Sequence, residues 1–259
     1  MVLKEQAEKR VFYLHQYKAR KEAEINRKNI VVTTGTGSGK TECFLLPMFA
    51  DLISESRTWD KTNRPRAMRA MILYPLNALA EDQMIRLRKA LNGQGKGRAL
   101  DWLDRCRGGN RFFFGRYTGS TPVSGRGDIA QENIRKERKQ LNEDWKAAQE
   151  SAKQTGNSEL LYHVPCMDSD SAEMWDRLSM QQNAPDSLIT NYSRRNVMLI
   201  REIEAPIFEE TKKGLKEDPS HVFHLVSDEL HTYRGTAGTE VAYLIRILLD
   251  RLGLTPDSP

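Results

Sequence analysis

The sequence predicts an α/β fold in which a mostly parallel sheet is flanked by helices. Two observations predict it: short apolar runs alternate with longer amphipathic stretches, and the first such run leads directly into a glycine-rich turn. Hydrophobic residues make up 39% and charged residues 29% of the 259 positions, so the chain has enough apolar material for a packed core. We therefore expect a single domain over residues 1–259.

The expected elements follow one another along the chain. Apolar side chains at three- and four-residue spacing predict helices up to about residue 27 and over residues 40–54, 78–91 and 239–252. Short apolar and β-branched runs predict strands over residues 29–34, 70–74, 111–117, 187–190 and 222–227. Residues 125–160 interrupt this order, because they carry seven basic and seven acidic side chains and few large apolar ones. We expect them to form a charged helical insertion on the surface.

The composition disfavours membrane and disulfide-rich secreted proteins. No apolar run approaches the roughly 18 residues that a membrane span needs. The charged residues at the start are not followed by the apolar stretch of a secretory signal. Cys43, Cys106 and Cys166 are an odd and widely spaced set, which argues against a disulfide framework or a paired-cysteine metal site. We expect a reduced, cytoplasmic protein without a membrane segment.

Positive charge is concentrated in one block of the chain. Residues 57–126 hold 15 basic and 5 acidic residues, whereas residues 127–259 hold 16 basic and 23 acidic ones. A basic block of this kind predicts a surface for a polyanion, of which nucleic acid is the commonest. A solvated basic face without a ligand would have the same composition, so the charge alone does not decide between the two.

The glycine-rich turn at residues 34–41 has the chemistry of a phosphate-binding loop. Its three glycines let backbone N–H groups turn inward around phosphate oxygens, and the helix that follows adds its positive N-terminal end. The strict pattern has glycine where this sequence has Thr34. An ordinary glycine-rich turn before a Lys-Thr pair is the alternative. We expect the nucleotide phosphates to contact Thr34, Gly35, Thr36, Gly37, Ser38, Gly39, Lys40 and Thr41.

A second motif, Asp-Glu-Leu-His, stands at the end of the last predicted strand. A phosphate loop needs a carboxylate from a neighbouring strand to hold Mg²⁺ together with Thr41, and Asp228 fits that role. Glu229 is then placed to orient or deprotonate the attacking water, and His231 to sense the γ-phosphate. An isolated Asp-Glu pair is more often an ordinary helix start. The presence of the phosphate loop favours the catalytic interpretation.

Together these motifs resemble the first RecA-like domain of superfamily 2 DEAD/DEAH-box (DExH) helicases. Gln16 resembles the upstream glutamine with which that family reads adenine. Three further segments resemble the motifs that hold one nucleic-acid strand; their matching residues are Pro75, Asn77, Thr118, Gly119, Thr190 and Asn191. The segment after the acidic motif resembles large MrfA-related repair helicases, and similar helicases occur in bacterial anti-phage systems such as Druantia and DISARM.

The resemblance implies ATP and Mg²⁺ as cofactors and a single nucleic-acid strand as partner, DNA more than RNA. Four arginines in the basic block are candidates for long-range attraction of phosphates, although an arginine at such a position is more often only a solvated charge: Arg86, Arg88, Arg111 and Arg116. Asn77 has a structural alternative, as a polar cap that opens a helix.

The sequence ends before the second RecA-like domain that the resemblance calls for. We therefore expect weak hydrolysis and no unwinding by this chain alone, with a second RecA-like domain or defence or repair subunits as partners. Two hypotheses stay open: the ATP-binding half of a helicase, or a truncated non-catalytic module with a vestigial nucleotide pocket. A phosphate-loop kinase is a third and weaker one, since it leaves the strand-binding motifs without a purpose.

Overall fold

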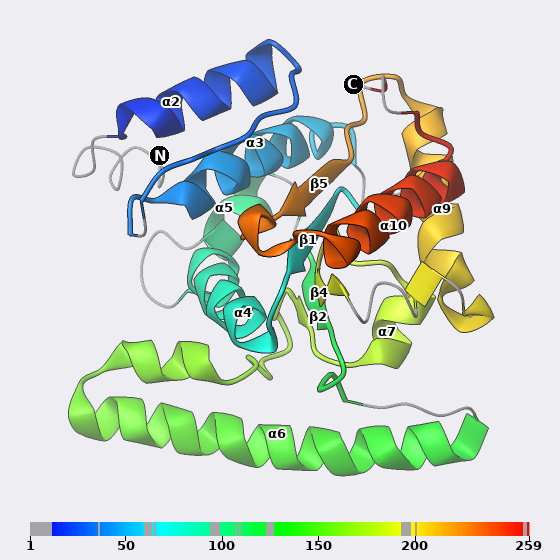
Figure 1. Ribbon diagram of the computed structural model, residues 1–259. Coiled ribbons are helices and arrows are strands. Elements are labelled where there is room, and N and C mark those ends of the chain that lie inside the picture. The colour runs from blue at the N-terminus through cyan, green and yellow to red at the C-terminus, as the bar shows by residue number, and fades with distance from the viewer. Residues whose placement is uncertain are drawn as a thin grey trace.

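A five-stranded, wholly parallel sheet runs through the centre of the molecule (Figure 1). The computed structural model describes residues 12–35, 37–59, 64, 66–93, 99–106, 108, 110–122, 127–192, 198–199, 201–255 and 258. The strands lie in the order β3-β2-β4-β1-β5. Their bounds are β1 Ala70–Tyr74, β2 Phe114–Tyr117, β3 Glu173–Met174, β4 Ser187–Asn191 and β5 His224–Ser227. The predicted α/β fold class is confirmed.

Helices cover both faces of this sheet. Figure 1 shows α3, α4 and α5 on one side and α7, α9 and α10 on the other. The bounds of the α-helices are α2 Leu14–Arg20, α3 Lys40–Glu55, α4 Asn77–Leu91, α5 Ala99–Cys106, α6 Gly127–Thr155, α7 Arg177–Gln182, α9 Ala205–Glu217 and α10 Thr236–Leu252. Short turns of other helix types are η1 Lys21–Ile25, η2 Ser158–His163, η3 Glu202–Glu204 and η4 Leu230–Thr232.

The inner strand β1, which lies between β4 and β5, shows why both layers are needed. Met71 and Leu73 belong to the core packed under α7, α9 and α10, whereas Ile72 and Tyr74 belong to the core under α3, α4 and α5. Successive side chains of a strand point to opposite faces, so a strand that is apolar at every position must be buried on both. All five residues of β1 are buried.

The charged segment forms the long helix α6, which runs along the outside of the molecule, and the chain then returns through η2 (Figure 1). The helix is fastened by a few buried contacts, such as Trp145, whose Nε1 donates to Asp168 Oδ1 at 3.0 Å. The helical character expected for this segment is therefore observed. No helix among the described residues is long and apolar enough to cross a membrane.

Two expectations about strands were wrong. Residues 29–34 run without strand pairing, and Val31 is 81% exposed. A β-branched run favours extended backbone, but a strand also needs a hydrogen-bonding partner, and within the described residues β5 pairs only with β1. The strand expected over residues 111–117 begins at Phe114. The helices α5, α7 and α9 and the short strand β3 were not anticipated.

Candidate nucleotide site and strand-binding edge

The carboxyl ends of four parallel strands meet at one edge of the sheet. Register pairs Tyr74 of β1 with Asn191 of β4, and Leu73 of β1 with Ser227 of β5. The same register pairs Tyr117 of β2 with Thr190. The residues that follow these strands therefore emerge side by side, which is where ligands bind in open α/β sheets.

The loop at residues 34–41 has the backbone that a phosphate cradle requires. Gly37 and Gly39 have φ angles of 73° and 79°, in the left-handed region that favours glycine, and α3 begins at the next residue. Ser38 Oγ lies within hydrogen-bonding distance of Thr34 Oγ1 and of the Gly35 carbonyl, 2.7 Å from each. Thr34, which replaces the glycine of the strict pattern, thus helps to hold the turn. Thr36 lies outside the described residues.

The phosphate loop and the acidic motif lie next to each other. Lys40 Nζ is 3.9 Å from Glu229 Oε1, and His231 Nδ1 is 3.3 Å from Glu229 Oε2. Asp228 Oδ1 accepts a hydrogen bond of 2.9 Å from the Glu229 backbone N–H. Glu229 and Lys40 are 26% and 30% exposed, so both can reach a ligand while remaining sheltered from bulk water.

Glu229 has a strained backbone. Its φ is +49°, a left-handed conformation that non-glycine residues adopt at a cost. The position is held on both sides: the Asp228 N–H donates to the Leu73 carbonyl at 3.0 Å, and the Glu229 carbonyl accepts from the Thr232 N–H and hydroxyl at 2.9 and 2.8 Å. Strain of this kind persists where surrounding contacts enforce it, and such positions cluster at functional sites.

Gln16 contacts the phosphate loop directly. Its Nε2 donates to the Gly39 carbonyl at 3.1 Å, and its Oε1 accepts from the Tyr13 N–H at 3.0 Å. The neighbouring His15, which the sequence analysis did not single out, places Nε2 2.9 Å from the Ser38 carbonyl. The predicted adenine-reading residue is therefore engaged with the loop backbone, and the contact joins α2 to the start of α3.

The oxygen donors of the site fit magnesium bound together with a nucleotide. Thr41 offers a hydroxyl on the first turn of α3, and Asp228 a carboxylate at the end of β5. Among the described residues no three His, Cys, Asp or Glu side chains gather into a group that could hold a metal. Magnesium commonly takes only one or two protein carboxylates and completes its shell with substrate phosphates and water.

The predicted strand-binding residues lie at the same edge but do not all present side chains to it. Asn191 Nδ2 donates to Asn77 Oδ1 at 2.7 Å, so the ends of β4 and β1 are joined at the surface. Asn77 is the first residue of α4 and not its cap. The cap is Leu76, and Pro75 directly precedes Leu76. The side-chain bond to Asn191 takes the place of the capping role considered above.

Thr118 and Thr190, two of the residues expected to hold the strand, are fully buried, so their side chains do not face it. The Thr190 hydroxyl donates to the Tyr117 carbonyl at 2.6 Å, and Thr118 Oγ1 lies 3.0 Å from Ser120 Oγ. The carbonyls of Thr118 and Gly119 accept from Arg177 Nη2 at 2.8 and 2.9 Å. These contacts fix the loop after β2, so Pro75, Gly119 and the two asparagines are the accessible members of the set.

All four candidate arginines form ion pairs, but they differ in how far their side chains are exposed. Arg88 is 3% exposed and pairs with Glu173 at 2.8 Å and with Glu81 at 3.0 Å, which makes it a structural residue. Arg116 also pairs with Glu81, and Arg111 pairs with Asp104; the Arg116 and Arg111 side chains are 24% and 16% exposed. Arg86 lies 3.7 Å from Glu42, but its side chain is 54% exposed, so it is the candidate best placed to attract phosphates from solution.

Comparison with known proteins identifies the family. Residues 13–107 match the DEAD/DEAH box helicase family model. The chain is 37% identical to the Druantia protein DruE of Escherichia coli (strain UMEA 4076-1) over 262 aligned positions, which cover 87% of this chain and 14% of that protein. The chain contains a DEAD/DEAH box helicase region.

Shorter stretches of the chain match two further relatives. The uncharacterized ATP-dependent helicase YprA of Bacillus subtilis (strain 168) is 37% identical over 83 residues, which cover 32% of this chain and 10% of that protein. The DEAD-box ATP-dependent RNA helicase 39 of Arabidopsis thaliana is 32% identical over 78 residues, covering 30% of this chain and 12% of that protein. The chain thus spans between 10% and 14% of these three relatives. No solved structure matches it with comparable significance.

Proposed function

We propose that this chain is the ATP-binding part of a nucleic-acid-dependent ATPase or helicase, and that it binds Mg-ATP and one nucleic-acid strand. The observation that carries the proposal is the approach of Lys40 Nζ to Glu229 Oε1 at 3.9 Å. It brings the phosphate loop and the acidic motif, which lie far apart in the sequence, to one place. A lysine for the phosphates beside a carboxylate for the attacking water is the arrangement that phosphoryl transfer to water requires.

Each residue of the site has a proposed role. The backbone N–H groups of the loop and Lys40 bind the phosphates, and Thr41 and Asp228 hold Mg²⁺. Mg²⁺ when bound neutralises charge on the β- and γ-phosphates. Glu229 orients the water and accepts its proton, and His231, in contact with Glu229, senses the γ-phosphate. Gln16 supports the loop at Gly39 and recognises adenine.

The strand is proposed to cross the edge formed by the ends of β1, β2 and β4. Asn77, Asn191 and Gly119 would contact its backbone, while Thr118 and Thr190 hold the edge in shape. We favour DNA over RNA on the resemblance to repair and defence helicases. Binding should weaken by an order of magnitude or more between about 50 and 200 mM salt, because phosphate contacts release counterions. A flat salt response would contradict a role for the basic block.

We also propose a biological setting for the chain. The similarity to the Druantia protein DruE favours a defence role over a repair role, with a second RecA-like domain or defence subunits as partners. Cys43 and Cys166 are buried free thiols, and we propose that the protein works in the cytoplasm.

ATP binding and turnover by the purified chain test the proposal. Wild-type protein should bind a fluorescent ATP analogue in the presence of Mg²⁺, and Lys40→Ala should lose that binding while unfolding at the same temperature as wild type. Turnover that rises on addition of single-stranded DNA would support the enzymatic role. Nucleic-acid binding without any nucleotide binding would favour the non-catalytic module, and equal ATP affinity in a folded Lys40→Ala variant would refute the phosphate-loop assignment.

A further inference from the structure

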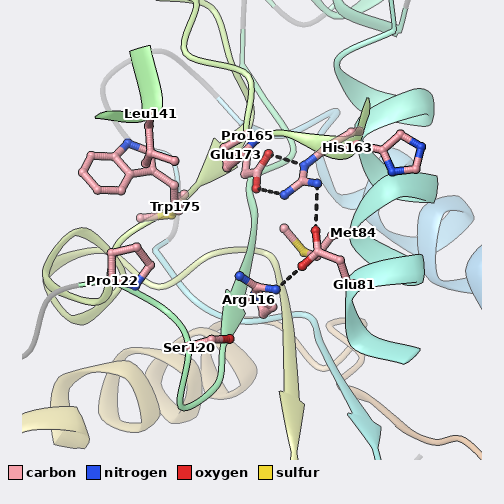
Figure 2. A pocket seen from close by; sticks show the side chains of 12 residues that line it. Glu81, Met84, Arg116, Ser120, Pro122, Leu141, His163, Pro165, Glu173 and Trp175 are labelled. Atoms are coloured by element: carbon pink, nitrogen blue, oxygen red, sulfur yellow. Dashed lines mark hydrogen bonds and ion pairs between the residues drawn. The ribbon is translucent and has the colours of Figure 1, made fainter. Parts of the chain in front are cut away.

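A pocket that the nucleotide site does not use opens beside the loop at residues 118–122 (Figure 2). Its volume is about 210 Å³, below the roughly 300–1,000 Å³ of sites that enclose a whole small-molecule ligand. Trp175, Leu141 and Pro122 lie along one side of it, and Arg116 and Glu81 along the other (Figure 2). The lining therefore combines an apolar, partly aromatic wall with a polar one.

The polar wall is rigid and electrically balanced. Arg88 donates to both Glu173 oxygens at 2.8 Å and to Glu81 at 3.0 Å, and Arg116 pairs with the other Glu81 oxygen. Two guanidinium groups thus face two carboxylates. A phosphate group would meet the Glu81 carboxylate here and gain little from the field, so the pocket suits a neutral polar ring better than an anion.

The pocket continues the proposed strand path. Ser120 lines it and lies 3.0 Å from the Thr118 hydroxyl. Arg177 fixes the same loop through the Thr118 and Gly119 carbonyls, and its backbone N–H donates to the Pro122 carbonyl at 3.3 Å. A strand that contacts Gly119 would therefore present its next base to a preformed opening.

We propose that this pocket binds one unstacked base of the nucleic-acid strand, with Trp175 as its stacking surface and Arg116 and Glu81 at its edge. The inference rests on the proposed function, because it needs a strand at the sheet edge. Bases stack on aromatic side chains irrespective of their identity, since every base has a π-face. A guanidinium has five donors, so Arg116 can bond Glu81 and a base edge together. Leu141 comes from α6, so the charged segment contributes to the site.

The test compares two single strands of equal length and equal charge, an oligothymidylate and a strand of abasic sites. Wild-type chain should bind the oligothymidylate more tightly by roughly fivefold or more, as expected for one stacked base. Trp175→Ala should bind both strands with the weaker affinity, and Trp175→Phe should keep the preference. Tyr243→Ala, which removes an aromatic ring that is 67% exposed on α10, is the matched control and should behave as wild type.

Each outcome bears on the inference in a different way. If Trp175→Ala retains the wild-type preference, or if wild type binds both strands equally, the base pocket is wrong while the proposed function stands. If wild type binds neither strand, the proposed function fails and the pocket with it. Because the readout is the ratio of two affinities of the same protein sample, a partly unfolded Trp175→Ala preparation would not imitate the expected loss of preference.

Discussion

The Gln16 amide occupies the space beside Gly39 that a β-carbon would need. Its Nε2 donates to the Gly39 carbonyl at 3.1 Å, and a methyl group at position 39 would overlap the amide and come within 3.0 Å of Glu42 Oε2. Gly39 also has a φ of 79°. The contact therefore depends on glycine for two independent reasons, and it links α2 to the loop from which α3 begins.

Gly39→Ala should distort the phosphate loop. We expect ATP affinity to fall at least tenfold, with a loss of roughly 1–2 kcal/mol in the free energy of unfolding, because left-handed backbone is costly for alanine and the Gln16 amide must move. Nucleotide titration and urea unfolding would measure both. Gly35→Ala is the comparison for stability, since a β-carbon there meets nothing within 4 Å. Equal stability and ATP affinity of Gly39→Ala and wild type would show that the loop tolerates the change.

Glu229→Gln should separate ATP binding from hydrolysis. The amide keeps the size of the carboxylate beside Lys40 but cannot accept a proton, so we expect ATP to bind with wild-type affinity or better. Turnover should fall by roughly 10²–10⁴, the usual contribution of a general base. Steady-state turnover with single-stranded DNA, next to a binding titration, would measure this. Parallel loss of binding and turnover would instead assign Glu229 to the binding of ATP.

Replacement by alanine should destabilise the protein at Arg88 but not at Arg86, which lies two residues earlier in α4. Arg88→Ala leaves the buried Glu173 without its partner, so we expect a loss of about 3–5 kcal/mol in the free energy of unfolding. Arg86 is 54% exposed, and Arg86→Ala should change stability by no more than about 0.5 kcal/mol. Urea unfolding measures both, and strand titration at low salt should show weaker binding for Arg86→Ala. A stable Arg88→Ala variant would refute its structural role.

Acid should destabilise the protein in part through Asp51. Burial alone would raise the pKa of this carboxyl, but hydrogen bonds from His224 at 3.0 Å and Arg27 at 2.8 Å outweigh it and lower the pKa. A carboxyl whose pKa is lower in the folded state stabilises it above the unfolded pKa, about 3.9, and this contribution is lost as the pH falls through the folded pKa.

Asp51→Asn should therefore flatten the fall in unfolding free energy below about pH 4. Urea unfolding at several pH values would measure the effect, with Asp250→Asn as the control because that carboxylate is 66% exposed. An Asp51→Asn profile as steep as that of wild type would assign the acid sensitivity to other groups.

Much of the fold follows from local pattern. The run at residues 70–74 is apolar at every position, which is possible only for a strand covered on both faces, and it forms the buried strand β1. The glycines of the phosphate loop and the Asp-Glu pair after β5 could also be read from sequence, because their chemistry depends on residue type and on neighbouring elements. Leu141 and Trp175 gave no comparable signal, since their shared pocket depends on how α6 packs.

Tertiary structure alone decided which polar groups are available. Arg88 and Arg86 look equivalent in the sequence, yet one is buried in an ion-pair chain and the other is exposed. The Thr190 hydroxyl bonds to the Tyr117 carbonyl because register places β4 beside β2. Residues 29–34 have the composition of a strand but do not pair with a neighbouring strand. The periodicity of a segment indicates which of its faces is apolar and must be buried. The hydrogen-bonding partners and the exposure of its polar groups depend on segments that are distant in the sequence, so a local pattern cannot predict them.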